Sequence, residues 1–77
     1  MVKKKSAKKK VLLTPLQMRR KSHGLSQVEI AAAAGISLKH YQNVEHYKVM
    51  PTVIIALRIA IVMRTSVEAL WGDIIDA

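Results

Sequence analysis

Helix-start and helix-stop signals divide most of this chain into short helical segments. Ser26 and Glu29 form a capping box, in which each side chain accepts a hydrogen bond from the other residue's backbone N–H. Gly35 suits the left-handed conformation that ends a helix, and Ser37 is the N-cap of the next one. Because residues 31–34 are all alanine, the helix that starts at Ser37 can cross the helix that starts at Ser26 closely. This pattern is typical of a helix-turn-helix.

The same signals recur before and after this pair. Thr14 and Gln17 make another capping box with Pro15 at the first helical position, and Thr52 and Ser66 are further N-caps. Strand signals are nearly absent. The sequence therefore predicts a compact all-α domain of five short helices over about residues 14–22, 26–34, 37–45, 52–63 and 66–71, the last of them ended by Gly72.

Apolar residues recur at helical spacing within these segments, as expected for helices that each bury one face. Ile36 is expected to plug the junction between the second and third helices. The remaining apolar positions should meet in one core, which we expect to contain Leu16, Leu25, Ile30, Ala31, Ala34, Tyr41, Val44, Val53, Ala56, Leu57, Ala60, Met63, Val67 and Leu70.

The fourth predicted helix carries more apolar residues than one core face requires. Ile54 and Ile61 bracket Arg58 on another face, and Ile74 and Ile75 follow in the tail. An exposed apolar patch on a small domain marks a partner surface, and twofold dimers are the commonest assemblies. We therefore expect these five residues to form a homodimer interface. The alternatives are a different protein partner, or a tail that folds back and covers the patch.

Positive charge is concentrated at the start of the chain. The sequence has a net charge of +8, and its first ten residues read MVKKKSAKKK. Such a segment is too charged to pack, so we expect a disordered arm over residues 1–10 and a folded domain over residues 11–77. A cationic arm attracts nucleic acid first and anionic membrane second, and Lys8, Lys9 and Lys10 are predicted phosphate contacts. A plain solvated tail is the alternative.

The sequence lacks the features of several other protein classes. The apolar stretch after the lysines is too short for a signal peptide, and Val53–Met63, interrupted by Arg58, is too short to span a membrane. There is no cysteine, and no two of His23, His40 and His46 have the spacing of metal ligands on one helix face. No nucleophile–base pair is apparent. We therefore expect a cytoplasmic protein that is not an enzyme and uses no metal or cofactor.

One ordered set of residues runs through positions 14–71 without a gap, namely Arg20, Leu25-Ser26-Gln27, Ile30-Ala31, Gly35-Ile36-Ser37, Tyr41, Val44-Glu45, Pro51, Leu57, Ala60, Ser66-Val67-Glu68 and Leu70-Trp71. This set resembles the phage repressor/Cro-like helix-turn-helix family, also called the XRE family. The resemblance implies a lambda-repressor-like fold and a double-stranded DNA partner. It also points to bacteria or their mobile elements as the source of the protein. The second helix of the pair would lie in the major groove, and residues 72–77 would form a tail.

The resemblance also assigns roles to individual residues. By resemblance, the base-reading residues are Leu38, Lys39 and Asn43, with Gln42 close by. Gln27 and Ser37 would contact phosphate, and Arg20 and Glu45 would form a partly buried ion pair. To these we add His46 and Lys48, which follow the third helix, as further phosphate contacts.

Three positions depart from the family pattern. Tyr47 falls where the family commonly has a glycine with positive φ, which predicts a strained or differently shaped loop. Ala34 replaces a common leucine, and Tyr41, larger than the common isoleucine, is expected to fill that space.

These observations favour a sequence-specific double-stranded DNA-binding transcriptional regulator. We expect a repressor that acts as a homodimer on a palindromic operator. The alternative is an antitoxin-like or accessory helix-turn-helix protein whose main role is to bind a partner protein. A third interpretation is an RNA- or membrane-binding basic peptide carried on a small helical domain, in which case residues 1–10 would hold most of the affinity.

Overall fold

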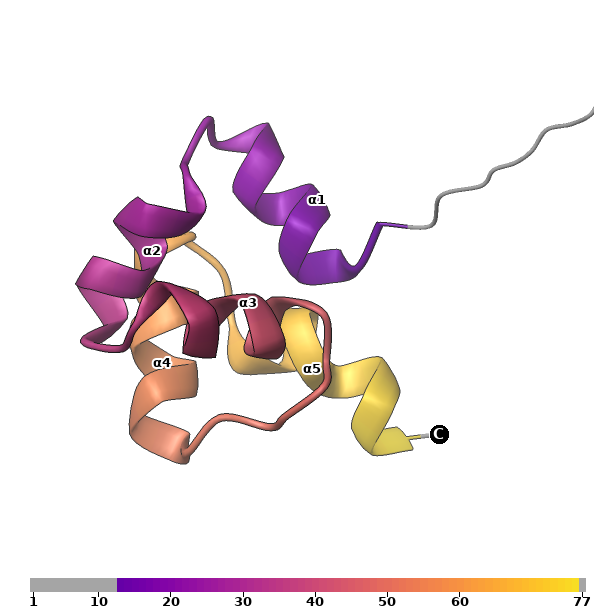
Figure 1. Ribbon diagram of the computed structural model, residues 1–77. Helices are drawn as coiled ribbons and strands as arrows, with labels where there is room; N and C mark the ends of the chain where they lie inside the picture. The colour runs from indigo at the N-terminus through magenta and orange to yellow at the C-terminus, as the bar shows by residue number, and fades with distance from the viewer. Residues whose placement is uncertain (1–12, 77) are drawn as a thin grey trace, which may run out of the picture.

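Five α-helices make up the part of the chain that the structure describes, and no strand occurs within it (Figure 1). The structure is a computed structural model that describes residues 13–76, so the expected lysine arm lies outside the described residues. The predicted all-α class and five helices are confirmed. The helices are α1 (Pro15–Ser22), α2 (Gln27–Ala34), α3 (Leu38–Glu45), α4 (Val53–Val62) and α5 (Val67–Asp76).

Capping side chains start the helices where the sequence places them. The Thr14 hydroxyl accepts from Gln17 N at 3.1 Å, while Gln17 Oε1 accepts from Thr14 N at 2.9 Å. Ser26 and Glu29 make the same reciprocal pair at 3.0 and 2.7 Å. Gly35 ends α2 with a φ of +75°, a conformation that a residue with a Cβ adopts only with strain. The turn between α2 and α3 therefore follows from local sequence alone.

The prediction that Gly72 ends the last helix is wrong. Residues 67–76 form one continuous helix, and Gly72 does not have a positive φ. A glycine stops a helix by adopting the left-handed conformation, whereas in the right-handed conformation it only weakens the helix, by about 1 kcal/mol relative to alanine. Leu70 and Trp71, just before the glycine, are buried. Their packing holds this segment of the chain in the helical conformation.

The core prediction is confirmed for most of its residues. Leu25 and Val67 pack against the core while remaining partly exposed, as does Ile36 at the junction of α2 and α3. Trp71 is absent from the predicted core, but it is only 2% exposed. The cluster of buried core residues contains Leu16, Ile30, Ala31, Ala34, Tyr41, Val44, Ala56, Ile59, Ala60, Met63, Leu70 and Trp71.

The predicted core face of α4 is partly wrong. Val53 and Leu57 are 75% and 47% exposed, whereas Ile59, which was not predicted, is fully buried. Nearly every residue of α4 is apolar, so the sequence pattern does not single out one face. The neighbouring helices determine which face of α4 is buried, because α4 packs against both α2 and α5. The buried residues of α4 are Ala56, Ile59 and Ala60, so the face in the core includes Ile59 and not Leu57.

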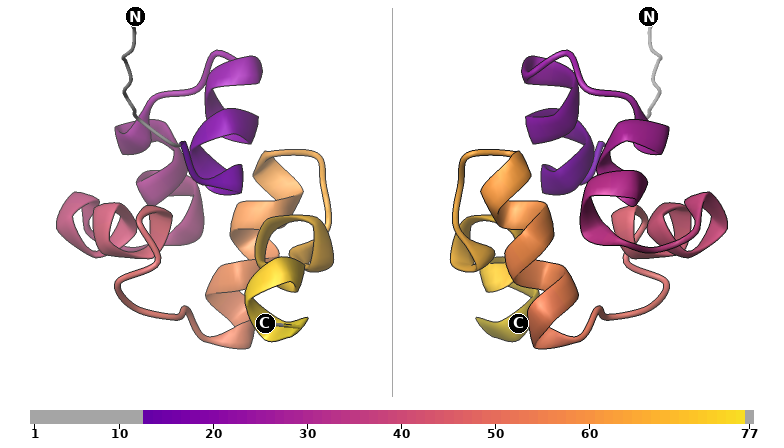
Figure 2. Two further views of the ribbon diagram at one scale, coloured as in Figure 1. Left: turned by 90° about the vertical axis from the view of Figure 1, so that its right-hand side faces the viewer. Right: turned by 90° about the vertical axis from the view of Figure 1, so that its left-hand side faces the viewer.

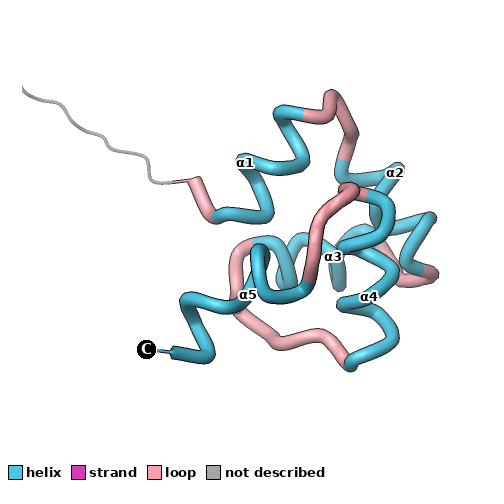
Figure 3. The backbone as a smooth tube through the Cα atoms, turned by 180° about the vertical axis from the view of Figure 1, so that it is seen from behind, coloured by secondary structure: helices cyan, strands magenta, loops and turns pink. Residues whose placement is uncertain are grey.

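Within the described residues, α3 makes its main helix–helix contact with α2. α2 packs against α3 and α4, and α5 packs against α1 and α4. In Figure 2, α3 lies at one side of the molecule, and α4 and α5 lie at the other. Figure 3 shows that all connections are short, the longest being residues 46–52 between α3 and α4. One face of α3 is consequently left uncovered.

Tyr47, in the loop after α3, has the positive φ expected at this position. Its φ is +60°, a value that is uncommon for a residue with a Cβ. The Tyr47 hydroxyl donates to the backbone O of Leu70 at 2.6 Å, and the ring packs against the core. These contacts hold the strained residue in place and connect the loop after α3 to α5.

Candidate nucleic-acid interface

The uncovered face of α3 carries the side chains predicted to read bases. Leu38 is 41% exposed, and Lys39 is exposed as well. Gln42 and Asn43, one turn further along the helix, are half-buried. Ser37 caps the helix, and its hydroxyl accepts from His40 N at 3.0 Å. One face of α3 therefore carries an apolar side chain, a cationic side chain and two amide side chains, namely those of Leu38, Lys39, Gln42 and Asn43.

Behind this face, α3 is anchored by a buried carboxylate. Glu45, the last residue of α3, has a fully buried side chain. Arg20 of α1 donates to both of its oxygens, from Nε to Oε1 at 2.7 Å and from Nη2 to Oε2 at 3.3 Å. A third guanidinium nitrogen, Arg20 Nη1, donates to Leu25 O at 3.0 Å. Arg20 and Glu45 therefore form an ion pair, and Arg20 also binds the loop between α1 and α2.

Two further side chains donate to the same carboxylate. The Tyr41 hydroxyl donates to Oε1 of Glu45 at 2.8 Å, and Gln27 Nε2 of α2 donates to Oε2 at 2.8 Å. The backbone O of Glu45 accepts from the Thr14 hydroxyl at 2.9 Å. A buried charge is costly unless it is paired and hydrogen-bonded, and this one is both. The Glu45 cluster, meaning Glu45 with Arg20, Gln27 and Tyr41, ties α3 to α1 and α2.

The cluster shifts the acid–base behaviour of its members. Burial alone would raise the pKa of the Glu45 carboxyl, but the hydrogen bonds from Arg20, Gln27 and Tyr41 outweigh it and leave that pKa below its ordinary value. The hydrogen bond to Glu45 raises the pKa of Arg20. Burial, together with the same carboxylate, strongly raises the pKa of the Tyr41 phenol. Near neutral pH the cluster therefore holds a carboxylate, a guanidinium and a neutral phenol.

Two residues that the sequence assigned to different DNA contacts touch each other. Gln42 Nε2 donates to Gln27 Oε1 at 3.2 Å, and Gln27 in turn donates to Glu45. Sequence reasoning missed this chain of contacts, and it placed Tyr41 only as a core residue. The spacing of four residues between Tyr41 and Glu45 is a signal that could have revealed their contact. No comparable signal links Gln27 to Gln42, because they come from different helices.

The remaining predicted phosphate contacts lie at the ends of α3. Ser37 is exposed at its N-terminus, and His46 and Lys48 are exposed just after its C-terminus. Lys48 N donates to Asn43 O at 2.8 Å, which keeps the loop folded against the helix end. The other candidates, Lys8, Lys9 and Lys10, lie outside the described residues.

Some of the basic residues near the start of the chain have structural contacts. Arg19 Nε donates to Met63 O at 2.9 Å, and its Nη2 donates to Arg64 O at 2.6 Å. These carbonyls belong to the two residues that directly follow α4, at the helix end where backbone oxygens lack helical partners and cations are favoured. Arg19 therefore caps α4, a role that its place in a run of basic residues does not reveal.

Most of the predicted dimer patch is exposed. Ile54 and Ile61 of α4 are 61% and 73% exposed, and Ile74 of α5 is 39% exposed. The residues up to Ile74 leave the two α4 isoleucines uncovered, and the side chain of Ile75 lies outside the described residues. Arg58, which was expected in the same patch, reaches the end of α2, where its Nη1 donates to Ala34 O at 3.2 Å.

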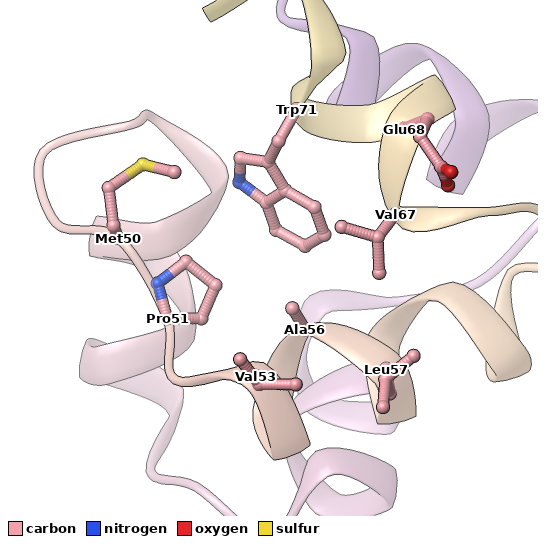
Figure 4. A pocket seen from close by; sticks show the side chains of 8 residues that line it. All are labelled: Met50, Pro51, Val53, Ala56, Leu57, Val67, Glu68 and Trp71. Carbon is pink, nitrogen blue, oxygen red and sulfur yellow. The ribbon is translucent and has the colours of Figure 1, made fainter. Parts of the chain in front are cut away.

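An apolar hollow of about 380 Å³ lies between α4, α5 and the loop that precedes α4. In Figure 4, Val53, Ala56 and Leu57 of α4 lie opposite Val67 and Trp71 of α5. The hollow explains why Val53 and Leu57 are exposed, since both stand on its wall. The remaining lining residues are Met50, Pro51 and Glu68.

Neither a metal centre nor a membrane span occurs in the described part of the chain. Among the side chains that the structure describes, those of residues 13–74, no three histidines or carboxylates come together as metal ligands. None of the helices within residues 13–76 is long and apolar enough to cross a lipid bilayer.

Comparison with known proteins agrees with this geometry. A family model described as helix-turn-helix matches residues 16–70, which is most of the chain and runs from α1 through α4 to Leu70 in α5. No curated protein matches the chain. The matched family consists of DNA-binding regulatory domains, and α2, Gly35 and α3 correspond to its characteristic pair of helices and turn. The chain belongs to the XRE-type (Cro/C1-type) family of helix-turn-helix DNA-binding proteins.

Proposed function

We propose that this protein is a sequence-specific transcriptional repressor that binds a palindromic operator as a homodimer. The observation that carries the proposal is the Glu45 cluster beneath the exposed face of α3. A helix that reads base edges must be held rigidly, because each hydrogen bond to a base depends on position and direction. Hydrogen bonds from α1, α2 and α3 itself to one buried carboxylate supply that rigidity.

The exposed side chains of α3 have chemistry suited to the major groove. An asparagine such as Asn43 can make two hydrogen bonds to adenine, and a lysine such as Lys39 can reach O6 and N7 of guanine. Leu38, 41% exposed, can pack against the methyl group of thymine. Together these residues would distinguish base pairs at several neighbouring positions.

Contacts to the DNA backbone would set the position of α3. Gln27 and Ser37 stand at the N-terminal ends of α2 and α3, where backbone N–H groups and the helix dipole favour a phosphate. His46 and Lys48 are exposed at the other end of α3. The lysines of residues 1–10 would add affinity for any duplex, with a steep dependence on salt, because they offer charge without base-specific geometry.

The homodimer part of the proposal is supported by the exposed apolar residues of α4. Ile54 and Ile61 are too exposed to contribute to the core of one chain, and burying them against a second copy is favourable. A twofold dimer would set two α3 helices roughly 34 Å apart, one DNA turn, and thereby match a palindromic site.

A second candidate function uses the same apolar surface. The exposed isoleucines of α4 and the adjoining hollow would also suit a different protein, as in an antitoxin-like or accessory member of the family. This candidate predicts a chain that is monomeric on its own and that hides Ile54 and Ile61 only when its partner is present.

Selection of binding sites from a random pool of double-stranded DNA, at about 0.15 M salt, tests the main proposal. The full chain is compared with a variant in which the six lysines of residues 1–10 are replaced by glutamine. We expect both proteins to enrich the same inverted repeat, with lower affinity for the variant. Enrichment of no motif, together with loss of binding in the variant, would mean that α3 reads no sequence.

A further inference from the structure

Gln42 lies on the base-reading side of α3, but its side-chain amide is directed at another protein residue. Gln42 Nε2 donates to Gln27 Oε1 at 3.2 Å, and both side chains are half-buried. We propose that Gln42 is a positioning residue that orients Gln27 for a DNA phosphate and does not itself read a base. The inference rests on the proposed DNA-binding function and changes the role expected for Gln42.

The orientation of the Gln27 amide is determined from both sides. Glu45 is ionised and can only accept hydrogen bonds, so Gln27 must present its nitrogen to Oε2 of Glu45, at 2.8 Å. Its oxygen then faces Gln42, which donates to it. The terminal torsion of a free glutamine is broad, so these two contacts remove most of its freedom.

One N–H of the Gln27 amide remains available in this arrangement. An amide nitrogen carries two hydrogens, and Glu45 takes one of them. Gln27 is the first residue of α2, next to the Ser26 cap, where the first backbone N–H groups point away from the helix. A phosphate at this end of α2 could accept from those groups and from the second N–H of Gln27.

The contact also makes α2 and α3 bind DNA as one unit. A phosphate held by Gln27 would fix the position of α2, and the bond from Gln42 passes that constraint to the middle of α3. If Gln42 were lost, the oxygen of Gln27 would lack its donor and the amide could rotate away. The expected cost is a loss of phosphate affinity that is equal for every DNA sequence.

A double-mutant cycle in the full chain tests this role. The variants are Gln42→Met, Gln27→Met and the pair together, because methionine keeps the length of the side chain and removes the amide. Affinities are measured for the duplex recovered from the random pool and for duplexes with one base pair changed in each half-site. We expect Gln42→Met to weaken binding by about three- to tenfold on every duplex, the range for one modest hydrogen bond.

Coupling between the two residues is the second expected result. In the Gln27→Met background, adding Gln42→Met should change affinity little, since the residue through which it acts is already gone. Asn43→Ala is the matched control on the next residue of α3, and its loss should depend on the base pair. Heteronuclear NMR of the free protein should show the Gln27 side-chain signals moving in Gln42→Met.

Three results would overturn the positioning role. These are an altered base preference in Gln42→Met, an undiminished effect of Gln42→Met in the Gln27→Met background, and unchanged affinity. Failure of the unaltered chain to select any DNA sequence is a different outcome, because it rejects the proposed function and this inference with it. In that case the NMR measurement still reports whether Gln42 holds Gln27.

Discussion

Arg20 Nε and Glu45 Oε1 lie 2.7 Å apart, and this ion pair joins α1 to the last residue of α3. The two residues are 25 positions apart in the sequence. The Glu45 carboxylate is fully buried, so solvent could not stabilise its charge if Arg20 were removed. The pair is therefore central to both the stability of the domain and the position of the proposed base-reading helix.

Removing the carboxylate should severely destabilise the domain. Glu45→Ala leaves Arg20, Tyr41 and Gln27 without their shared acceptor, and breaking a buried pair in this way costs about 3–5 kcal/mol. That is comparable to the whole stability of a domain of this size, so the variant should be largely unfolded in a chemical denaturation experiment. Glu68→Ala, which removes an exposed carboxylate at the start of α5, is the control and should cost less than about 1 kcal/mol. Equal stability of the two variants would contradict the role given to Glu45.

Stability should fall in acid because of the same carboxylate. The pKa of Glu45 is lower in the folded chain than its ordinary value of 4.5, so the unfolded chain binds the proton more tightly. The stabilisation is therefore fully present above about pH 4.5 and is lost as pH falls toward the folded pKa. Urea unfolding at about pH 7 and about pH 3.5 measures the difference. In Glu45→Gln this part of the pH dependence should disappear, and an identical pH dependence in both proteins would argue against it.

Asn43→Ala should weaken DNA binding at particular base pairs. The loss of a two-bond contact to adenine is expected to cost about 1–3 kcal/mol of discrimination against the other bases. Lys48→Ala provides the contrast. Loss of a phosphate contact should weaken binding to all duplexes alike and reduce the slope of log affinity against log salt concentration by about one. Affinities of both variants for the selected site and its single-base variants separate the two patterns. A uniform loss in Asn43→Ala would remove Asn43 from the base-reading set.

Two glycine substitutions should change stability in opposite directions. A Cβ at Gly72 would lie 4.0 Å from Glu68 Cβ, an ordinary contact, and alanine is the better helix former. Gly72→Ala should therefore stabilise the fold by about 0.5–1 kcal/mol. Gly35→Ala should instead cost about 1–2 kcal/mol, because its φ is +75° and its Cβ would lie 3.1 Å from Arg58 Nη1. Thermal unfolding of both variants checks the pair, and a destabilised Gly72→Ala would mean that α5 is interrupted at that residue.

Ile61→Glu should shift the proposed dimer toward monomer without unfolding it. Ile61 is 73% exposed in the single chain, so a charge is tolerated there but would be buried in a dimer at high cost. Sedimentation equilibrium should show a weaker dimer, and binding to an inverted repeat should weaken more than binding to one half-site. Met18→Glu, which changes a 52% exposed residue of α1, is the control and should leave association unchanged. Equal association of both variants and the unaltered chain would place the interface elsewhere.

Much of the fold could be predicted from the sequence because its causes are local. Thr14, Ser26, Ser37 and Thr52 each accept a backbone hydrogen bond from a residue three positions ahead, so a short window of sequence defines each helix start. Gly35 ends α2 for an equally local reason, namely its freedom to adopt a positive φ. The order of residues alone is consequently enough to reveal the pair of helices and its turn.

Only the tertiary structure decided which of several locally equivalent choices the chain makes. Gly72 can end a helix or lie within one, and the burial of Leu70 and Trp71 selects the second. The apolar residues of α4 offer several faces, and packing between α2 and α5 selects the one with Ile59. The contact of Gln42 with Gln27 depends on how two helices cross, a geometry that no single segment encodes. Local sequence determined the helices and their caps, because hydrogen bonds between near neighbours create them. Packing determined the faces and the polar contacts, because these arise only when distant segments meet.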